Sequence, residues 1–283
     1  MIRNPGRLAT PFAVAAVAVL LLAAVVGMVA GAASANASNS NGANSGVASS
    51  SSPSVVCGQA PVHLGAAAHF RILAGRTITN TGATTVKGNI GVSPGSAVTG
   101  FPPGTVTGTI HVADTAAANA QLALKTAYNT ASGRTNCPVS VAGNLGGQTL
   151  GPGLYKSTSS LSISSGDLTL TAHGHPNAVF IFQMASKFTT TSGRHVILAG
   201  GALASHIYWV VGSSATLGTT SVVYGNILAH KSISLATGAV LHGRALANIG
   251  AVTLAGNTLA YAPYSATSAP TPSRALSAAM VVP

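Results

Sequence analysis

A short internal repeat constrains the fold of this chain more than any other feature. The residues Thr-Leu-Gly-Thr at 216–219 recur as Ser-Leu-Ala-Thr at 234–237 and as Thr-Leu-Ala-Gly at 253–256. The copies start eighteen and then nineteen residues apart. Similarity at a fixed period indicates stacked supersecondary units. A period this short predicts a β-solenoid, in which each coil holds about three short strands joined by turns.

The repeat also predicts which side chains face outward. Leu217, Leu235 and Leu254 are expected to point into the solenoid. The Thr or Ser before each leucine is expected to point outward, because strand side chains alternate. Stacked coils would place these hydroxyls about 4.8 Å apart along the solenoid axis. We therefore expect one outward row made of Thr79, Thr189, Thr216, Ser234 and Thr253.

The composition excludes most catalytic chemistry. Among 283 residues the only acids are Asp114 and Asp167, and there is no Glu. A chain this poor in carboxylates has little means of acid–base catalysis or of binding hard metal ions. The formal net charge is +11, but the cations are scattered singly and are not interleaved with aromatic residues. This pattern argues against a nucleic-acid partner and favours only a general attraction to anionic surfaces.

The first 35 residues have the pattern of an export signal. Arg3 and Arg7 precede an apolar run from Phe12 to Ala30, and a small-residue cleavage site follows at 33–35. An uncleaved N-terminal anchor is the alternative, because the apolar run is nearly long enough to span a bilayer. Either reading places the rest of the chain outside the cytoplasm, secreted or held at the cell surface.

The remaining boundaries follow from composition. Residues 36–54 are rich in Ser, Asn and Gly, which predicts a flexible linker. The solenoid domain is expected over residues 55–261, and the Pro/Ser/Ala-rich stretch 262–283 is expected to be a disordered tail.

Cys57 and Cys137 are the only cysteines, and an even number in an exported chain predicts one disulfide with Cα atoms within about 7 Å. Two buried free thiols are the alternative.

One helix is expected, over residues 113–131, where apolar residues recur at helical spacing. Either Asp114 or Thr115 can cap its start, and Gly133 follows its end. At about 1.5 Å per residue the helix is about 28 Å long, close to the length of six stacked coils. It is therefore predicted to lie along one side of the solenoid. The wholly apolar run 178–183 predicts a strand that is buried on both sides.

Several motifs, in order along the chain, resemble those of the microbial ice-binding protein family. The resemblance covers about residues 62–260. It implies a mainly β fold, a right-handed discontinuous β-solenoid of triangular cross-section with one long helix packed along its side. It also implies that the N-terminal coil packs beside the C-terminal one. From the residues themselves, no cofactor and no enzyme activity are expected. The motifs lie at residues 70–82, 88–95, 99–104, 127–129, 145–150, 152–156, 178–183, 225–229 and 243–247.

In that family a flat solenoid face carrying Thr, Ser, Ala, Gly and Asn binds ice. The resemblance implies adsorption to the ice surface, which inhibits ice growth or recrystallisation. Cations next to the matching strands, at Arg76, Arg194 and Arg244, would spoil such a face if they lay on it. The matching positions here are Thr77, Thr79, Thr189, Thr191, Thr216, Thr219, Ser234, Thr237, Thr253 and Asn257.

Several functions other than ice binding can be compared with the sequence. A cell-surface adhesion or structural solenoid that does not bind ice is the alternative, and cations or aromatic residues interrupting the face would favour it. A metal site at His173 and His175 lacks a third ligand at a suitable spacing. Ser-His-Asp catalysis is disfavoured because Asp114 fits a helix cap and Asp167 a turn. A polysaccharide-cleaving β-helix is disfavoured because it would need clustered carboxylates. The expected partner is the ice surface, the expected state is a monomer, and membrane contact is expected only through an uncleaved leader.

Overall fold

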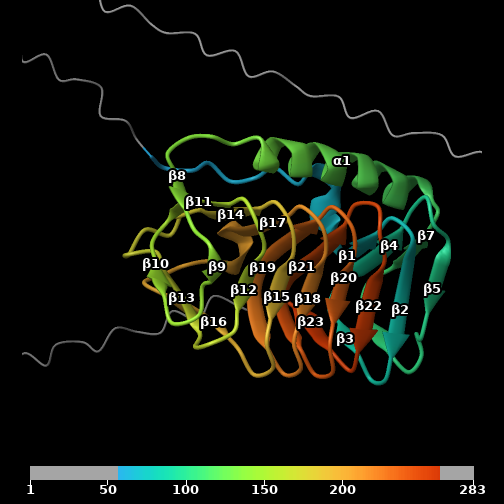
Figure 1. Ribbon diagram of the computed structural model, residues 1–283. Coiled ribbons are helices and arrows are strands. Elements are labelled where there is room, and N and C mark those ends of the chain that lie inside the picture. The colour runs from blue at the N-terminus through green and yellow to red at the C-terminus, as the bar shows by residue number, and fades with distance from the viewer. Residues whose placement is uncertain (1–56, 262–283) are drawn as a thin grey trace, which may run out of the picture. The chain divides into compact units, whose positions relative to one another are not determined.

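The computed structural model describes residues 57–261, which form a stack of parallel strands with one long helix beside it (Figure 1). The predicted leader at 1–35, linker at 36–54 and tail at 262–283 lie outside the described residues. Each coil of the stack contributes short strands to three sides of the solenoid. We call them the helix side, the hydroxyl side and the third side.

The helix side is the part of the twelve-stranded sheet that faces the helix. Its inward side chains fill the solenoid, and its outward side chains are covered by other parts of the chain. It is built from β8 (Pro138–Ser140), β11 (Gly153–Ser157), β14 (Phe180–Met184), β17 (Ile207–Val211), the second halves of β19 (Val222–Ala229) and β21 (Val240–Ala247), then β1 (Phe70–Ala74), β4 (Asn89–Val92) and β7 (Ile110–Val112).

The hydroxyl side is a separate eight-stranded sheet in which neighbouring strands pair in parallel. Most of its strands are only three or four residues long, so each presents one or two residues to the outside. In spatial order the strands are β9 (Gly143–Asn144), β12 (Leu161–Ile163), β15 (Phe188–Thr190), β18 (Ala215–Leu217), β20 (Ile233–Leu235), β22 (Val252–Ala255), β2 (Thr77–Thr81) and β5 (Ala97–Thr99).

The third side combines a three-stranded sheet with the first halves of β19 and β21, which bend there from one side to the next. The bend falls at Gly225 and Gly243, which pair with each other. Gly225 has a φ of 116°, and a Cβ on Gly243 would lie 1.7 Å from the Gly225 carbonyl oxygen, so only glycine fits this close approach. The other strands are β10 (Thr149–Leu150), β13 (Leu168–Thr171), β16 (Val196–Ala199), β23 (Thr258–Ala260), β3 (Thr85–Val86) and β6 (Thr105–Val106).

The stack is discontinuous in sequence, as predicted. β1 pairs in parallel with β21, β2 with β22 and β3 with β23. The N-terminal coils, residues 70–112, therefore continue the stack that the C-terminal coils end. The chain must then travel back to the opposite end of the stack to begin β8, and the helix makes this return (Figure 1).

Helix α1 spans Thr115–Ser132, close to the predicted 113–131. Asp114 caps it, because its side chain accepts a 2.8 Å hydrogen bond from the Ala117 N–H, and Gly133 follows its last residue. Two of the apolar residues that suggested this helix, Ala113 and Ala116, are exposed, because Ala113 lies before the cap and Ala116 faces away from the solenoid. The buried face consists of Ala117, Ala120, Leu124, Ala127 and Ala131.

This helix face covers the outward side chains of the helix side, together with residues 62–70, which include the short 3-10 helix η1 (Gly65–His69). A second 3-10 turn, η2 (Ala204–His206), leads into β17. Strand β14 is consequently buried along its whole length, which confirms the prediction of a strand buried on both sides. No helix within residues 57–261 is long and apolar enough to cross a membrane.

The inward side chains of all three sides meet in one continuous core. Its centre is a stack of aromatic rings that runs along the solenoid axis. The Tyr155 and Phe182 ring centroids are 5.0 Å apart, those of Phe182 and Trp209 4.3 Å, and those of Phe188 and Trp209 4.4 Å. The Trp209 indole N–H donates to the Tyr224 carbonyl at 2.9 Å, so the ring's polar atom is satisfied inside the core.

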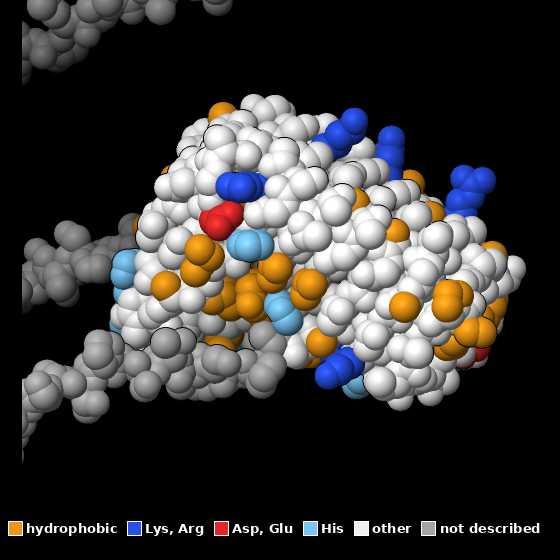
Figure 2. All heavy atoms as spheres, turned by 90° about the horizontal axis from the view of Figure 1, so that it is seen from below, with side chains coloured by type: hydrophobic (Ala, Val, Ile, Leu, Met, Phe, Trp, Pro, Cys, Tyr) orange, Lys and Arg blue, Asp and Glu red, His pale blue; other side chains and the backbone are white. Residues whose placement is uncertain are grey.

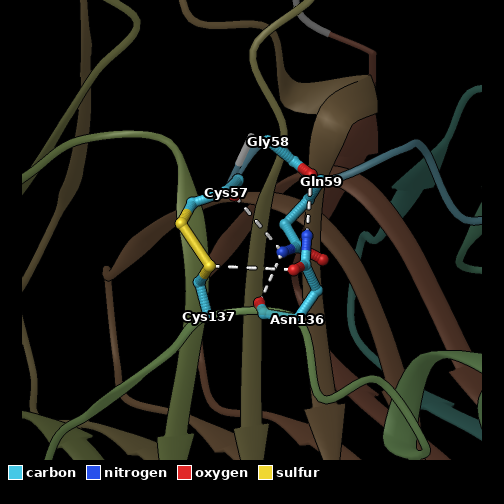
Figure 3. The surroundings of a disulfide bond; sticks show 5 residues. All are labelled: Cys57, Gly58, Gln59, Asn136 and Cys137. Carbon is cyan, nitrogen blue, oxygen red and sulfur yellow. Dashed lines mark hydrogen bonds between the residues drawn. A yellow bond between two sulfur atoms is a disulfide. The ribbon is translucent and has the colours of Figure 1, made fainter. Parts of the chain in front are cut away.

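The predicted disulfide between Cys57 and Cys137 is present, with Cα atoms 5.5 Å apart (Figure 3). Beside it, the Gln59 side-chain amide donates to the Asn136 carbonyl at 2.9 Å. The link fastens the start of the described chain to the residue just before β8. It closes a loop of 80 residues, and loop-entropy models give such a link about 3–5 kcal/mol.

Candidate functional site

The hydroxyl side carries one continuous outward row of polar residues, which we call the central row. Strand pairing joins each member to the next, so neighbours are about 4.8 Å apart. The predicted stacking of Thr79, Thr189, Thr216, Ser234 and Thr253 is confirmed by this register. The full row, in spatial order, is Asn144, Ser162, Thr189, Thr216, Ser234, Thr253, Thr79 and Thr99.

The short strands explain why the row faces outward. In β18, Ala215 and Leu217 are buried while Thr216 between them is exposed. β20 and β22 repeat this alternation around Ser234 and Thr253. A three-residue strand with apolar first and third residues can bury both only by turning its middle residue to solvent.

The hydroxyls of the central row are largely free of internal partners. Seven of the eight residues in the row carry a hydroxyl. Within residues 57–261 only the Ser162 hydroxyl makes a hydrogen bond, a long 3.4 Å contact to the Gly143 carbonyl. Asn144 lies at the end of the row, and its side chain bonds a neighbouring turn. It donates to Ser165 Oγ at 2.7 Å and accepts from the Ser164 N–H at 2.8 Å. The six remaining hydroxyls are therefore available to an external surface or to water.

Two further predicted residues flank the central row. Thr77 precedes Thr79 by two residues and pairs with Ala97, so it belongs to the neighbouring outward row. Thr191 follows Thr189 by two residues and is exposed, but its hydroxyl donates to the Ser164 carbonyl at 3.1 Å. Small residues complete these flanks, as where Thr81 pairs with Ala255.

Thr219 and Thr237 lie in the turns that leave the hydroxyl side, not in its strands. Both side chains are exposed. Their carbonyls join successive turns, because that of Thr219 accepts from the Gly193 N–H at 2.8 Å and that of Thr237 from the Thr220 N–H at 3.0 Å. These residues therefore form the margin of the face.

The expectation that Asn257 lies on the outward face is wrong. Its exposed fraction is 1%, and its side chain points into the turn. Its amide donates to the carbonyls of Ala236 at 2.8 Å and Ala239 at 3.0 Å, and its Oδ1 accepts from the Ala255 N–H. Asn257 thus bonds three backbone groups at this corner, adding a second donor to each of the two carbonyls and giving the Ala255 N–H its acceptor. Thr84, in the Thr-Gly-Ala-Thr motif at 81–84, is also buried and donates to Asn80 Oδ1.

Sequence reasoning missed three members of the central row: Asn144, Ser162 and Thr99. Ser162 could have been found, since it stands between Leu161 and Ile163 with the same alternation as the repeats. Thr99 had no such signal, because its strand lies in a loop-like sequence and its position is fixed only by pairing with β2.

Most of the cations next to the predicted strands lie off this face. Arg194 and His195 are near Asp167, at 3.9 Å and 3.7 Å, beyond the turn that follows Thr191. His242 belongs to the third side, where its ring stacks on Tyr224. Arg244 belongs to the helix side and donates to the Ala68 carbonyl. Arg76 is exposed just before Thr77, at the edge of the hydroxyl side.

The two arginines on the helix side share one aromatic ring. The guanidinium carbons of Arg71 and Arg244 lie 4.0 Å and 4.7 Å from the centroid of the Tyr261 ring. Burial lowers the pKa of each to about 10, and for Arg244 the neighbouring Arg71 charge contributes as well. The Arg71 guanidinium also donates to the Gly243 carbonyl at 2.9 Å, so this cluster joins β1 to β21 and is structural.

Within residues 57–261 no three His, Cys, Asp or Glu side chains come together in a way that could hold a metal ion. The central row contains no titratable group. A rigid parallel β-solenoid with a straight row of free hydroxyls defines a class of protein that binds an extended, regular surface.

The comparisons with known proteins give the particular family. The family described as Ice-binding-like matches residues 72–260, and the chain belongs to it. An ice-binding protein of Nostoc sp. (strain HG1) is 46% identical over 202 residues, covering 71% of this chain and 74% of that protein. An ice-binding protein of Flavobacterium frigoris (strain PS1) is 38% identical over 213 residues, covering 70% and 75%.

Solved structures agree with this assignment. The crystal structure of an ice-binding protein from an Antarctic biological consortium has a TM-score of 0.71 at 54% identity. The match covers 72% of this chain and 92% of that one. An ice-binding protein from the Antarctic ascomycete Antarctomyces psychrotrophicus has a TM-score of 0.69 at 37% identity, covering 72% and 99%.

Proposed function

We propose that this protein binds ice through the hydroxyl side, with the central row at the centre of the contact. One observation carries the proposal: six hydroxyls, from Thr189 to Thr99, stand in one row at strand spacing without a hydrogen-bond partner among residues 57–261. The family membership and the ice-binding relatives support the same conclusion.

The mechanism is surface matching. Regularly spaced hydroxyls and methyl groups order the adjacent water into a layer that merges with the ice lattice. Binding is favourable because the strands are already rigid, so little conformational entropy is lost when the face adsorbs. Adsorbed molecules then force ice to grow between them as curved fronts, which inhibits growth and recrystallisation.

The scaffold fits this demand for rigidity. Each strand of the hydroxyl side is bonded to a neighbour on both flanks, apart from β9 and β5 at its two ends. Behind the row, Leu217, Leu235 and Leu254 are essentially fully buried in the close-packed core. A side chain on such a backbone keeps its position without further support.

The protein is proposed to act by binding, not by catalysis, and to act outside the cytoplasm. The disulfide between Cys57 and Cys137 supports an oxidising compartment. The adhesion reading is not favoured, because Arg194, His242 and Arg244 all lie away from the central row.

Ice-affinity partitioning of the purified protein tests the proposal. Wild type is expected to enter the ice fraction, and Thr216→Tyr to remain in the liquid, because one ring in mid-row holds the whole face away from the lattice. Thr258→Tyr is the matched control: Thr258 is an exposed strand threonine on the third side, so this variant should partition like wild type. Circular dichroism confirms folding. Exclusion of wild type from ice contradicts the function, and equal effects of the two tyrosines contradict the site.

A further inference from the structure

Three cations stand along the edge between the helix side and the hydroxyl side. Lys187 comes just before β15, Lys231 before β20 and Arg76 before β2, and all three are exposed. In the sheet order β2-β22-β20-β18-β15, one strand separates each of these strands from the next. Two inter-strand steps are about 9.6 Å, so the charges recur on every second strand along this edge. By the strand pairing Arg76 is level with Lys231, whereas Lys187 is level with Ser232, one residue further along. We call this row the cationic edge.

The cationic edge is not neutralised by the described part of the chain. None of the three side chains makes a hydrogen bond or ion pair within residues 57–261. The two acids lie elsewhere: Asp114 pairs with His111 at the start of α1, and Asp167 lies near Arg194. Figure 2 shows several Lys and Arg side chains projecting from the upper border of the view, whereas an acidic side chain on the left lies beside another cation.

The geometry restricts the class of partner. Cations that recur on every second strand of a rigid edge fit an extended polyanion better than they fit a compact acidic protein, whose charges would not repeat. Between the cations the edge carries Ser213, Ser214, Ile249 and Gly250, so it offers no aromatic ring on which a nucleic-acid base could stack. Ile249 is one isolated apolar side chain, too little to anchor the edge in a lipid bilayer.

We propose that the cationic edge binds linear acidic polysaccharides, which carry carboxylate or sulfate groups at regular intervals. The polymer would lie beside the central row, parallel to it. Such a contact would hold the protein in an anionic matrix through a surface different from the one proposed for ice. The proposal does not depend on ice binding, since it rests on other residues.

The test is titration calorimetry of the full protein with polygalacturonate at low ionic strength. Wild type is compared with Arg76→Gln/Lys187→Gln/Lys231→Gln and with the control Lys87→Gln/Lys125→Gln/Lys156→Gln. Both triple variants remove three exposed cations that make no side-chain hydrogen bond within the described residues. At roughly half a kcal/mol or more per exposed charge pair, the edge variant should lose about tenfold or more in affinity. The control should stay within about threefold of wild type.

Three outcomes overturn the proposal: no binding by wild type, equal losses in the two triple variants, or tighter binding to single-stranded DNA or anionic vesicles than to polygalacturonate. Neutral dextran should not bind, and affinity should fall as salt rises, because the contact is between exposed charges. Ice-affinity partitioning of the edge variant should remain that of wild type. This measurement separates a failure of the polysaccharide proposal from a failure of ice binding.

Discussion

At the scale of single residues, the polar side chains of the solenoid serve two opposite purposes. Those of the central row face solvent and keep their hydroxyls free. Those at the corners face inward and are fully used, as where Thr190 Oγ1 bonds Ser221 Oγ at 3.0 Å and Asn257 bonds three backbone groups. The same residue types therefore support recognition on one side of the backbone and stability on the other.

Replacing Asn257 tests the stabilising group. Asn257→Ala should lower the free energy of unfolding by about 2–3 kcal/mol, because the Ala255 N–H loses its acceptor and the Ala236 and Ala239 carbonyls each lose one of two donors in a buried place. Urea unfolding followed by circular dichroism measures the change. Thr258→Ala, one residue further and exposed, should stay within about 0.5 kcal/mol of wild type. Ice partitioning of folded Asn257→Ala should be unchanged. If this variant no longer partitioned into ice, Asn257 would have to belong to the ice-binding face.

Asp114 should make stability depend on acid pH. The pKa of Asp114 lies below the ordinary 3.8. The larger cause is the hydrogen bond that its carboxylate accepts from the Ala117 N–H, and the second is the bond with the His111 side chain 2.6 Å away. A carboxyl with a lowered folded pKa stabilises the protein above its unfolded pKa, near 3.9, and this contribution is lost as pH falls through the folded value. Asn keeps the capping acceptor but not the charge.

The unfolding free energies of wild type and Asp114→Asn are therefore expected to differ at pH 7 and to converge as pH falls through the lowered pKa of the Asp114 carboxyl. Denaturant titrations across pH 2–7 provide the measurement. A difference that stays constant over this range would contradict the assigned charge effect.

At the scale of elements, repeat and periodicity were sufficient for the strands from β18 onward and for α1, because those segments alternate or recur strictly. They were less informative for the two-residue strands β3, β6 and β9, which are too short to show alternation. Asn257 was misplaced because the third repeat copy is followed by a turn that folds its side chain inward. Composition cannot reveal this, because the inward turn depends on the carbonyls of the preceding coil.

The helix offers a matched pair of leucines for testing its packed face. Leu124 is fully buried against the helix side, whereas Leu122, two residues earlier, is 67% exposed. Leu124→Ala should cost about 2–5 kcal/mol through lost burial and a cavity. Leu122→Ala should stay within about 0.5 kcal/mol of wild type, since both variants gain the same small helix propensity. Chemical denaturation of the two variants measures this, and similar losses would show that the helix does not pack as described.

At the scale of the whole molecule, one binding face is assembled from distant parts of the chain. Thr253 pairs with Thr79, so the central row passes from the C-terminal coils to the N-terminal coils without a break. The repeat alone predicted the stacking of the C-terminal coils. The junction was predicted by resemblance to the family, since no local pattern in β2 specifies β22 as its partner.

The N-terminal coils should therefore contribute to ice adsorption as much as the repeats do. Thr79→Tyr is expected to abolish ice partitioning as Thr216→Tyr does, although the two positions lie on opposite sides of the junction. Thr105→Tyr is the control, an exposed threonine in the N-terminal coils but on the third side. If Thr79→Tyr partitioned like wild type, the working face would be limited to the C-terminal coils.

The junction between β1 and β21 also determines when the molecule can be complete. Residues 70–112 are translated before the other coils, yet the strands that close against them belong to residues 240–260. Until those last coils emerge, β1, β2 and β3 each have an open edge, and open edges invite pairing with other chains. A nascent chain stopped before residue 240 thus lacks its closing coils and leaves its earliest strands unprotected. The continuous row therefore exists only after nearly the whole solenoid has been translated, so the complete binding face cannot form earlier in synthesis.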